Sequence, residues 1–128
     1  MRRIDDFNEL PTFRNYQRLA TATALYPGRD SFAGFCYGVF KLGSEAGEVS
    51  GKAGKLFRDL GIEWGSDPKQ WPEEVRQGIK SELGDVLWYI AAVARELGYS
   101  IQDVAGANID KLEGREERGT VHGDGDNR

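Results

Sequence analysis

The chain has 128 residues, of which 30% are charged, and its net charge at pH 7 is -4. This length predicts one domain with a modest core. The acidic balance argues against broad binding to duplex nucleic acid, because such binding relies on lysine and arginine facing phosphates. No apolar run reaches the roughly 20 residues needed to span a bilayer, and the first residues lack the apolar core of a signal peptide. We therefore expect a cytoplasmic protein with neither a nucleic acid nor a membrane as its partner.

The single cysteine, Cys36, lies in an apolar segment. One cysteine cannot form a disulfide framework or a thiolate zinc cluster. We interpret Cys36 as a small core residue.

Four segments carry apolar residues at helical spacing: residues 8–25, residues 32–60, residues 72–98 and a last segment that starts after Ser100. Pro27-Gly28 and Gly61 are expected to end the first two, while Ser31 or Asp30 can cap the second. Pro72 suits the first position of the third helix, and Ser100 with Asp103 forms an approximate capping box for the fourth. These four helices, without a convincing strand, predict an all-α, four-helix bundle-like fold.

The end of the chain differs in composition from the helical segments. From Gly114 onward it is polar and rich in glycine, which is typical of a flexible tail. We assign residues 1–118 to the domain and residues 119–128 to the tail.

The second predicted helix contains an unusual number of glycines: Gly38, Gly43, Gly47, Gly51 and Gly54. Each costs about 1 kcal/mol of helix stability relative to alanine. The pattern therefore favours close approach of a neighbouring helix or a ligand, with a kink as the alternative.

Two acids in the third predicted helix, Glu82 and Asp85, lie beside its apolar face. At about 100° per residue, the apolar residues of this helix fall within an arc roughly 80° wide. Glu82 projects about 20° outside that arc and Asp85 about 80° outside it. Because a buried carboxylate is costly unless it is protonated, paired or bound to a metal, we expect a positive partner beside these acids.

A second pair of acids with the same spacing, Glu45 and Glu48, lies in the second predicted helix. Acids three residues apart share a helix face, and carboxylate oxygens are the ligands that Mg²⁺ prefers. Together the two pairs favour a metal site, although each alone is also compatible with an ordinary solvated face. A ferritin-like di-iron site needs Glu-x-x-His pairs, and the single histidine, His122, lies in the predicted tail.

The two acid pairs and the residues around them resemble the signature of a known family. Glu45-Ala-Gly-Glu48 followed by Glu82-Leu-Gly-Asp85-Val-Leu-Trp-Tyr is similar to the E-x-x-E…E-x-x-D signature of MazG-like, all-α nucleoside triphosphate pyrophosphohydrolases. The resemblance extends over roughly residues 15–128. It includes Asn108-x-x-Lys111-Leu112-x-x-Arg115, which is similar to the last helix of the family. The loop between the two acid pairs is longer than in the shortest members.

The resemblance implies hydrolysis of a (d)NTP between its α- and β-phosphates, giving the (d)NMP and pyrophosphate. It implies that Glu45, Glu48, Glu82 and Asp85 are catalytic and hold Mg²⁺, for which Mn²⁺ can substitute. A metal-bound water would attack the α-phosphorus, and one glutamate could also act as general base. The implied assembly is a homodimer or a dimer of dimers, with sites near subunit contacts.

Five further residues are candidates for substrate binding: Lys52, Lys55, Asn108, Lys111 and Arg115. The two lysines follow Glu48 by one and two turns and could offset phosphate charge, or they could be solvated. The other three recur on one face of the fourth predicted helix. We interpret Trp88 and Tyr89 mainly as core residues, and Arg58 as pairing locally with Asp59. Tyr16 and Gln17 are weaker candidates for base recognition, and Arg118 and Arg128 for contacts of the tail with phosphates.

Two alternatives stay open. One is a dUTPase/dCTPase-type specialist or a phosphoribosyl-ATP pyrophosphohydrolase of the same superfamily, which a comparison of bases would identify. The other is a non-catalytic helical module that binds a metal or a protein partner. Calorimetry would favour the module if Mg²⁺ bound while nucleotide analogues did not.

Overall fold

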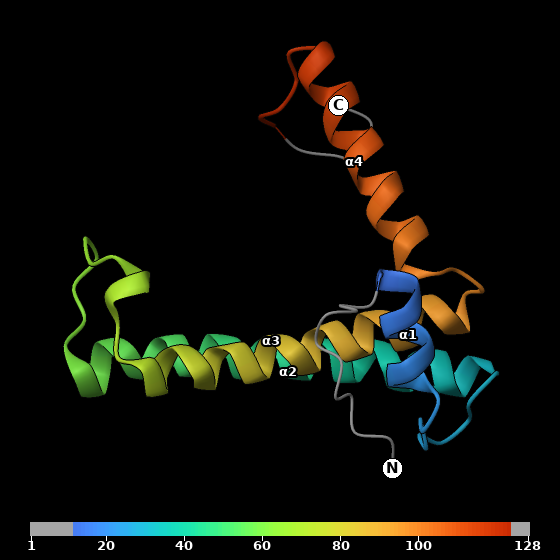
Figure 1. Cartoon of the computed structure of the whole chain (residues 1–128), viewed down its shortest axis with the longest axis horizontal. Coiled ribbons are helices and arrows are strands. Elements are labelled where there is room, and N and C mark those ends of the chain that lie inside the picture. The colour runs from blue at the N-terminus through green and yellow to red at the C-terminus, as the bar shows by residue number, and fades with distance from the viewer. Residues whose placement is uncertain (1–11, 124–128) are drawn as a thin grey trace.

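The computed structural model describes residues 12–123, which form four α-helices and a short 3-10 helix (Figure 1). The helices are α1 (Phe13–Thr21), α2 (Phe32–Leu60), α3 (Glu73–Glu96) and α4 (Ile101–Glu117), and η1 (Pro68–Gln70) lies in the connection between α2 and α3. There is no strand within residues 12–123, which confirms the all-α class.

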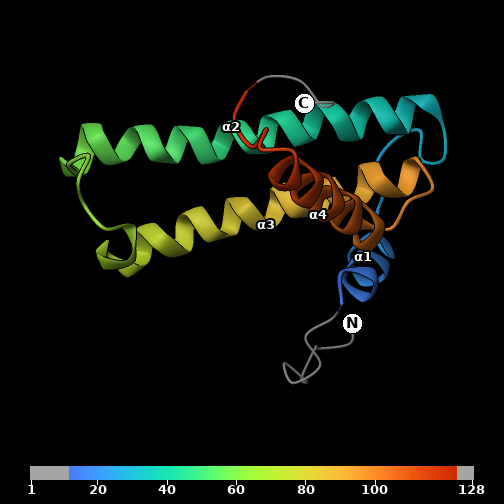
Figure 2. The same cartoon turned by 90° about the horizontal axis from the view of Figure 1, so that it is seen from above.

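Helices α2 and α3 form a long antiparallel hairpin (Figure 2). The bounds of α2 match those predicted, and Gly61 ends the helix with φ of 58°. Glycine suits this left-handed position because it has no Cβ. Helix α3 begins one residue later than predicted, with Pro72 as its N-cap. Ser31 occupies the N-cap position of α2, but its hydroxyl donates to the carbonyl of Gly28 and does not cap the helix.

Helix α1 is shorter than predicted. Residues 8–11 lie outside the described residues, and the helix ends at Thr21, whose hydroxyl donates to the carbonyl of Gln17 over 2.7 Å. The chain after Thr21 is not helical and places Ala24 and Tyr26 in the core. The turn that follows thus replaces the predicted last turn of the helix.

The core lies around the C-terminal half of α3. Ala91 and Ala92 are 0% and 1% exposed, and these small side chains allow α1 and the following loop to approach closely. Trp88 contacts Tyr26 edge to face and donates its indole N–H to the carbonyl of Ala20 over 2.9 Å. The core assignment of Trp88 is confirmed, and Tyr89 is partly buried beside it.

Gln17 joins α1 to both α3 and α4. Its amide donates to the carbonyls of Ala91 and Tyr99, both over 3.0 Å, and accepts from the amide of Ile101 over 3.3 Å. The side chain is buried, so these bonds satisfy its polar groups away from water. The structure therefore gives Gln17 a structural role, and its contact with a base stays a prediction.

Among the glycines of α2, Gly38 meets the expectation of close helix approach. A Cβ at this position would lie 2.9 Å from Cγ2 of Val93 on α3, so the Val93 side chain or the helix would have to shift to make room for it. At the other four glycines, no atom of another described helix or loop lies within 4 Å of the place that a Cβ would occupy. For these four, the predicted neighbour is not present within the described part of the chain, and α2 runs through them as one helix.

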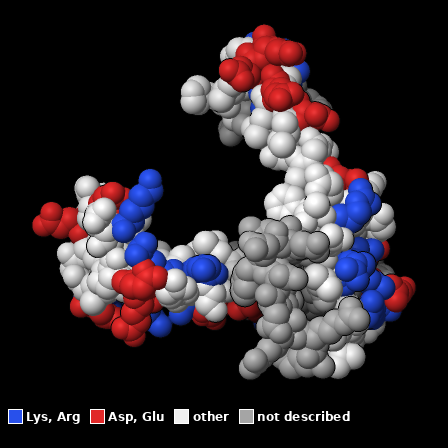
Figure 3. Space-filling model, in the orientation of Figure 1, with Lys and Arg blue, Asp and Glu red and all other residues white. Residues whose placement is uncertain are grey.

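Helix α4 projects away from the hairpin, so within one chain it does not lie alongside α2 and α3 as in a four-helix bundle (Figures 1 and 2). Figure 3 shows uncharged residues along α4 between the body of the molecule and the charged far end of the helix. Val104, Ile109 and Leu112 are 43%, 54% and 50% exposed. On α2, Phe32 and Phe40 of the expected apolar face are also exposed. These side chains lack the cover that a bundle would supply.

The glycine-rich composition that starts at Gly114 does not mark the end of the last helix. Helix α4 continues to Glu117, and Arg115 is buried. The amide of Thr120 donates to the carbonyl of Arg115 over 2.8 Å. Arg128 lies outside the described residues. Within those residues, none of the helices combines the length and apolar character that crossing a membrane requires.

Candidate metal centre

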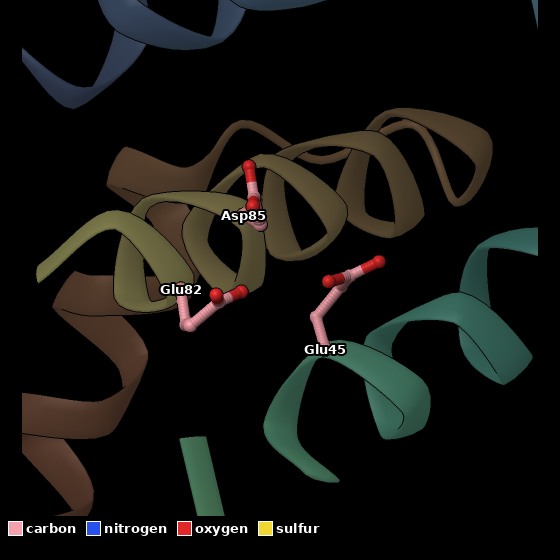
Figure 4. Close-up of side chains that lie close together, drawn as sticks. All are labelled: Glu45, Glu82 and Asp85. Atoms are coloured by element: carbon pink, nitrogen blue, oxygen red, sulfur yellow. The ribbon is translucent and has the colours of Figure 1, made fainter. Parts of the chain in front are cut away.

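Three of the four predicted acids converge on the hairpin. Glu45 on α2 and Glu82 and Asp85 on α3 each offer a carboxylate oxygen within 4.8 Å of the others. Figure 4 shows Glu45 and Glu82 directed toward one another, with Asp85 further along α3. The Glu45 and Glu82 side chains are 14% and 19% exposed, whereas Asp85 is exposed. These three residues are called the acid cluster below.

The sequence places these acids by simple periodicity. On α3, Glu82 and Asp85 are three residues apart and therefore share a face. On α2, Glu45 follows the buried Gly38 by seven residues, which is about two turns, so both face α3. The predicted position of Glu82 at the border of the apolar face agrees with its partial burial.

Lysines from α2 compensate two of the three charges. Lys52 Nζ lies 3.2 Å from Oε1 of Glu82, which confirms the expectation of a positive partner beside this acid. Lys41 Nζ lies 2.7 Å from Oε1 of Glu45, and this hydrogen bond raises the pKa of Lys41. Lys41 is not among the predicted residues, although its i, i+4 spacing from Glu45 is a common signal for an ion pair.

Tyr16 on α1 is a neighbour of the acid cluster. The pKa of its phenol is raised, first by burial and then by the negative charge of Asp85. This charge acts on Tyr16 because α1 packs across α3 beside the cluster (Figure 4). Tyr16 was predicted only as a weaker candidate for base recognition, without a link to Asp85.

Glu48, the fourth predicted acid, is exposed and is not one of the acids that meet in the cluster. It lies three residues beyond Glu45 on α2. Its role as a metal ligand stays a prediction.

A cavity of about 370 Å³ lies between α2 and α3 on the loop side of the acid cluster. Lys52 and Lys55 both line it, so the two predicted phosphate-binding lysines share one space. Asp59 also lines the cavity, but Arg58 holds its carboxylate over 2.5 and 2.8 Å and lowers its pKa. The predicted local pairing of Arg58 is thereby confirmed.

The remaining predicted substrate residues, Asn108, Lys111 and Arg115, lie on α4. Asn108 and Lys111 are exposed and line a separate cavity of about 590 Å³ beside Tyr99 and Val104. Because α4 projects from the hairpin, the structure does not bring this stripe to the acid cluster of the same chain (Figure 1).

The donor set of the acid cluster fits a hard divalent cation. All three side chains offer oxygen, and the cluster contains no histidine or cysteine. Such oxygen donors suit Mg²⁺ or Mn²⁺ better than the softer metals that favour thiolate or imidazole. The lysine partners of Glu45 and Glu82 show that these carboxylates attract cations.

Comparison with known proteins agrees with this site. Residues 41–120, well over half of the chain, match the model of the MazG nucleotide pyrophosphohydrolase domain, and this range includes the acid cluster. The chain is also 39% identical over 117 residues to the Gene 37 protein of Mycobacterium phage L5. The matched region covers 88% of this chain and 96% of that protein. No solved structure matches the chain. The matched domain shows that this chain belongs to the family of MazG nucleotide pyrophosphohydrolase domains.

Proposed function

We propose that this protein is a Mg²⁺-dependent nucleoside triphosphate pyrophosphohydrolase that cleans or balances a nucleotide pool. It converts a (d)NTP to the (d)NMP and pyrophosphate. The observation that carries the proposal is the acid cluster, which lies beside a cavity lined by two lysines. This arrangement offers a place for divalent cations next to a place for the phosphates that such cations bind.

Glu45, Glu82 and Asp85 would hold the metal, and Glu48, three residues further along α2, would join them. When bound, Mg²⁺ supplies positive charge for the phosphates and a water of lowered pKa. The hairpin keeps Glu45 and Glu82 partly shielded from solvent, which strengthens their attraction for a cation. Water attacks the α-phosphorus, and the bond from this phosphorus to the bridging oxygen breaks with pyrophosphate as the leaving group.

Lys52 and Lys55 would bind the β- and γ-phosphates. Both residues line the cavity, and Lys52 also pairs with Glu82. They can thus offset the charge that builds up on pyrophosphate as it leaves.

Asn108, Lys111 and Arg115 would bind nucleotide from a second copy of the chain. They lie on α4, which projects away from the acid cluster of its own chain. The exposed apolar residues of this helix, Val104, Ile109 and Leu112, favour a homodimer or a dimer of dimers in which α4 is covered.

The test is an assay of pyrophosphate release from each dNTP and NTP with Mg²⁺. We expect release that is lost with Glu82→Gln and Asp85→Asn, and retained with Glu63→Gln, an exposed acid outside the acid cluster. Strong preference for a uracil or cytosine nucleotide would identify a specialist enzyme. No release from any nucleotide, or release that the two cluster variants leave unchanged, would contradict the proposal.

A further inference from the structure

Lys52 lies at the boundary between the acid cluster and the lysine-lined cavity. Its ammonium is 3.2 Å from Oε1 of Glu82, and the same side chain lines the cavity together with Lys55. The Lys52 side chain is 37% exposed and that of Glu82 only 19%, so the lysine is the less enclosed partner of this ion pair. One ammonium group therefore lies within reach of both the acid cluster and the cavity.

In the structure, Lys52 supplies the positive charge that a metal would bring to Glu82. A divalent cation bound by the acid cluster would draw the Glu82 carboxylate to itself and repel the adjacent ammonium. The pair between Lys52 and Glu82 and the metal site thus compete for the same oxygen atoms. Lys41 stands in the same relation to Glu45, but it does not line the cavity.

The surroundings give Lys52 room to move along the hairpin. An atom at the Cβ position of Gly78 would lie 3.7 Å from Lys52 Nζ, and glycine leaves this place without a side chain. Lysine also has a flexible four-carbon stem that can place its charge at more than one point. Movement past Gly78 leads into the cavity, toward Lys55.

The positive part of the cavity is the part near the acid cluster. Lys52 and Lys55 are one turn apart on α2, whereas Asp59 follows Lys52 by seven residues, or roughly 10 Å of helix. Asp59 is already engaged by Arg58, and Glu74 lines the cavity from the first turn of α3. A phosphate group is therefore attracted to the end where Lys52 and Lys55 lie.

We propose that Lys52 exchanges between two anions. Without metal it neutralises Glu82, and with metal bound it turns into the cavity and binds the pyrophosphate part of the nucleotide with Lys55. This inference rests on the proposed function and adds a coupling: metal binding releases the lysine that the phosphates require. It follows that Lys52 opposes the binding of metal alone and favours the binding of phosphate.

The experiment measures two affinities by calorimetry, first for Mg²⁺ alone and then for pyrophosphate at saturating Mg²⁺. For Lys52→Met we expect Mg²⁺ to bind up to about fivefold tighter, because a competing cation is removed. We expect pyrophosphate to bind about tenfold weaker, because a charged hydrogen-bond donor is lost. A lysine with a purely structural role would not move the two affinities in opposite directions.

Two matched variants separate the two halves of this effect. Lys41→Met removes the other lysine of the acid cluster, and we expect tighter Mg²⁺ binding with unchanged pyrophosphate binding. Lys55→Met removes the second lysine of the cavity, and we expect weaker pyrophosphate binding with little change for Mg²⁺. If Lys52→Met does not fold, the lysine amine signals of the unmodified protein provide a second readout by NMR. Added Mg²⁺ should then shift the Lys52 signal, and pyrophosphate should shift it again.

Weaker Mg²⁺ binding by Lys52→Met, or pyrophosphate binding that neither cavity variant weakens, would overturn the proposal. An unmoved Lys52 signal would do the same. Neither affinity depends on turnover, so the outcome is distinct from that of the proposed function. If the two affinities shift in opposite directions but no nucleotide is hydrolysed, the exchange is supported and the proposed enzymatic function is rejected. If nucleotides are hydrolysed but the affinities do not shift in opposite directions, the enzymatic function is supported and the exchange is rejected.

Discussion

The α2–α3 hairpin and α4 carry the two groups of predicted site residues. Within the described part of the chain, only the residues of the hairpin have neighbours from the same chain that complete their surroundings. On the hairpin, two of the three clustered acids have lysine partners within 3.2 Å from the same chain. On α4, Ile109 is 54% exposed and the polar stripe lies away from the acid cluster. The difference is that one chain brings the acids of the hairpin together, whereas it leaves the polar stripe of α4 apart from them.

The largest expected effect is on the hairpin. If the proposed function holds, Asp85→Asn should lower hydrolysis at least about a hundredfold, because it removes one carboxylate of the acid cluster that is proposed to hold the metal. The temperature of unfolding should stay the same or rise, since the exposed Asp85 charge no longer repels the other acids. Initial rates of pyrophosphate release and thermal unfolding followed by circular dichroism measure the two effects. Loss of folding together with activity would contradict a purely chemical role for Asp85.

The next prediction tests whether α4 acts on the site of a second copy. Mixing the Asp85→Asn and Lys111→Met variants, each nearly inactive, should restore activity to about a quarter of the unmodified level, because half of the resulting dimers contain one intact site. Refolding the two together allows the subunits to exchange before the assay. The control is Asp85→Asn mixed with Glu82→Gln, since both changes lie on the hairpin and no intact site can form. Equal activity in both mixtures would mean that α4 serves its own chain.

A third prediction concerns the junction between the two regions. Gln17→Leu should lower the free energy of unfolding by about 2–3 kcal/mol, because the carbonyls of Ala91 and Tyr99 and the amide of Ile101 lose their buried partner. Urea unfolding followed by circular dichroism measures the change. Arg18→Leu, at the neighbouring exposed position, should shift stability by less than about 0.5 kcal/mol. Equal effects of the two variants would show that the Gln17 hydrogen bonds contribute little.

The sequence was most informative where short-range physics decides. Both bounds of α2 and the capping box of Ser100 and Asp103 were predictable, because local apolar spacing, a stop glycine and caps specify them. The two acid motifs indicated that Glu45 and Glu82 lie near one another, but not how far apart. That distance depends on the close approach of α2 to α3, which Gly38 allows.

Long-range packing accounts for what the sequence could not indicate. A helical wheel identifies an apolar arc but does not say which neighbour covers it. For this reason Phe32 and Phe40, on the expected apolar face of α2, are exposed in the structure. The same limit applies to α4, whose spacing is compatible both with a closed bundle and with a helix that projects from its own chain. Glu48 shares the motif of Glu45, yet only Glu45 of this pair meets the α3 acids in the cluster.

The smallest expected effect is the pH dependence of the capping box that begins α4. The hydroxyl and amide of Ser100 donate to the Asp103 carboxylate over 2.6 and 3.0 Å, and they lower the pKa of Asp103 below its usual 3.8. Because the folded pKa is depressed, the charge of Asp103 stabilises the protein fully well above pH 3.8 and is lost as the pH falls through the folded pKa. The difference in unfolding free energy between the unmodified chain and Asp103→Asn should therefore be constant from about pH 7 to pH 5 and shrink below pH 3.8. Urea unfolding at each pH measures it, with Asp110→Asn on the same helix as the control. A difference that persists at the lowest pH would mean that the side chain stabilises α4 by hydrogen bonding alone, without its charge.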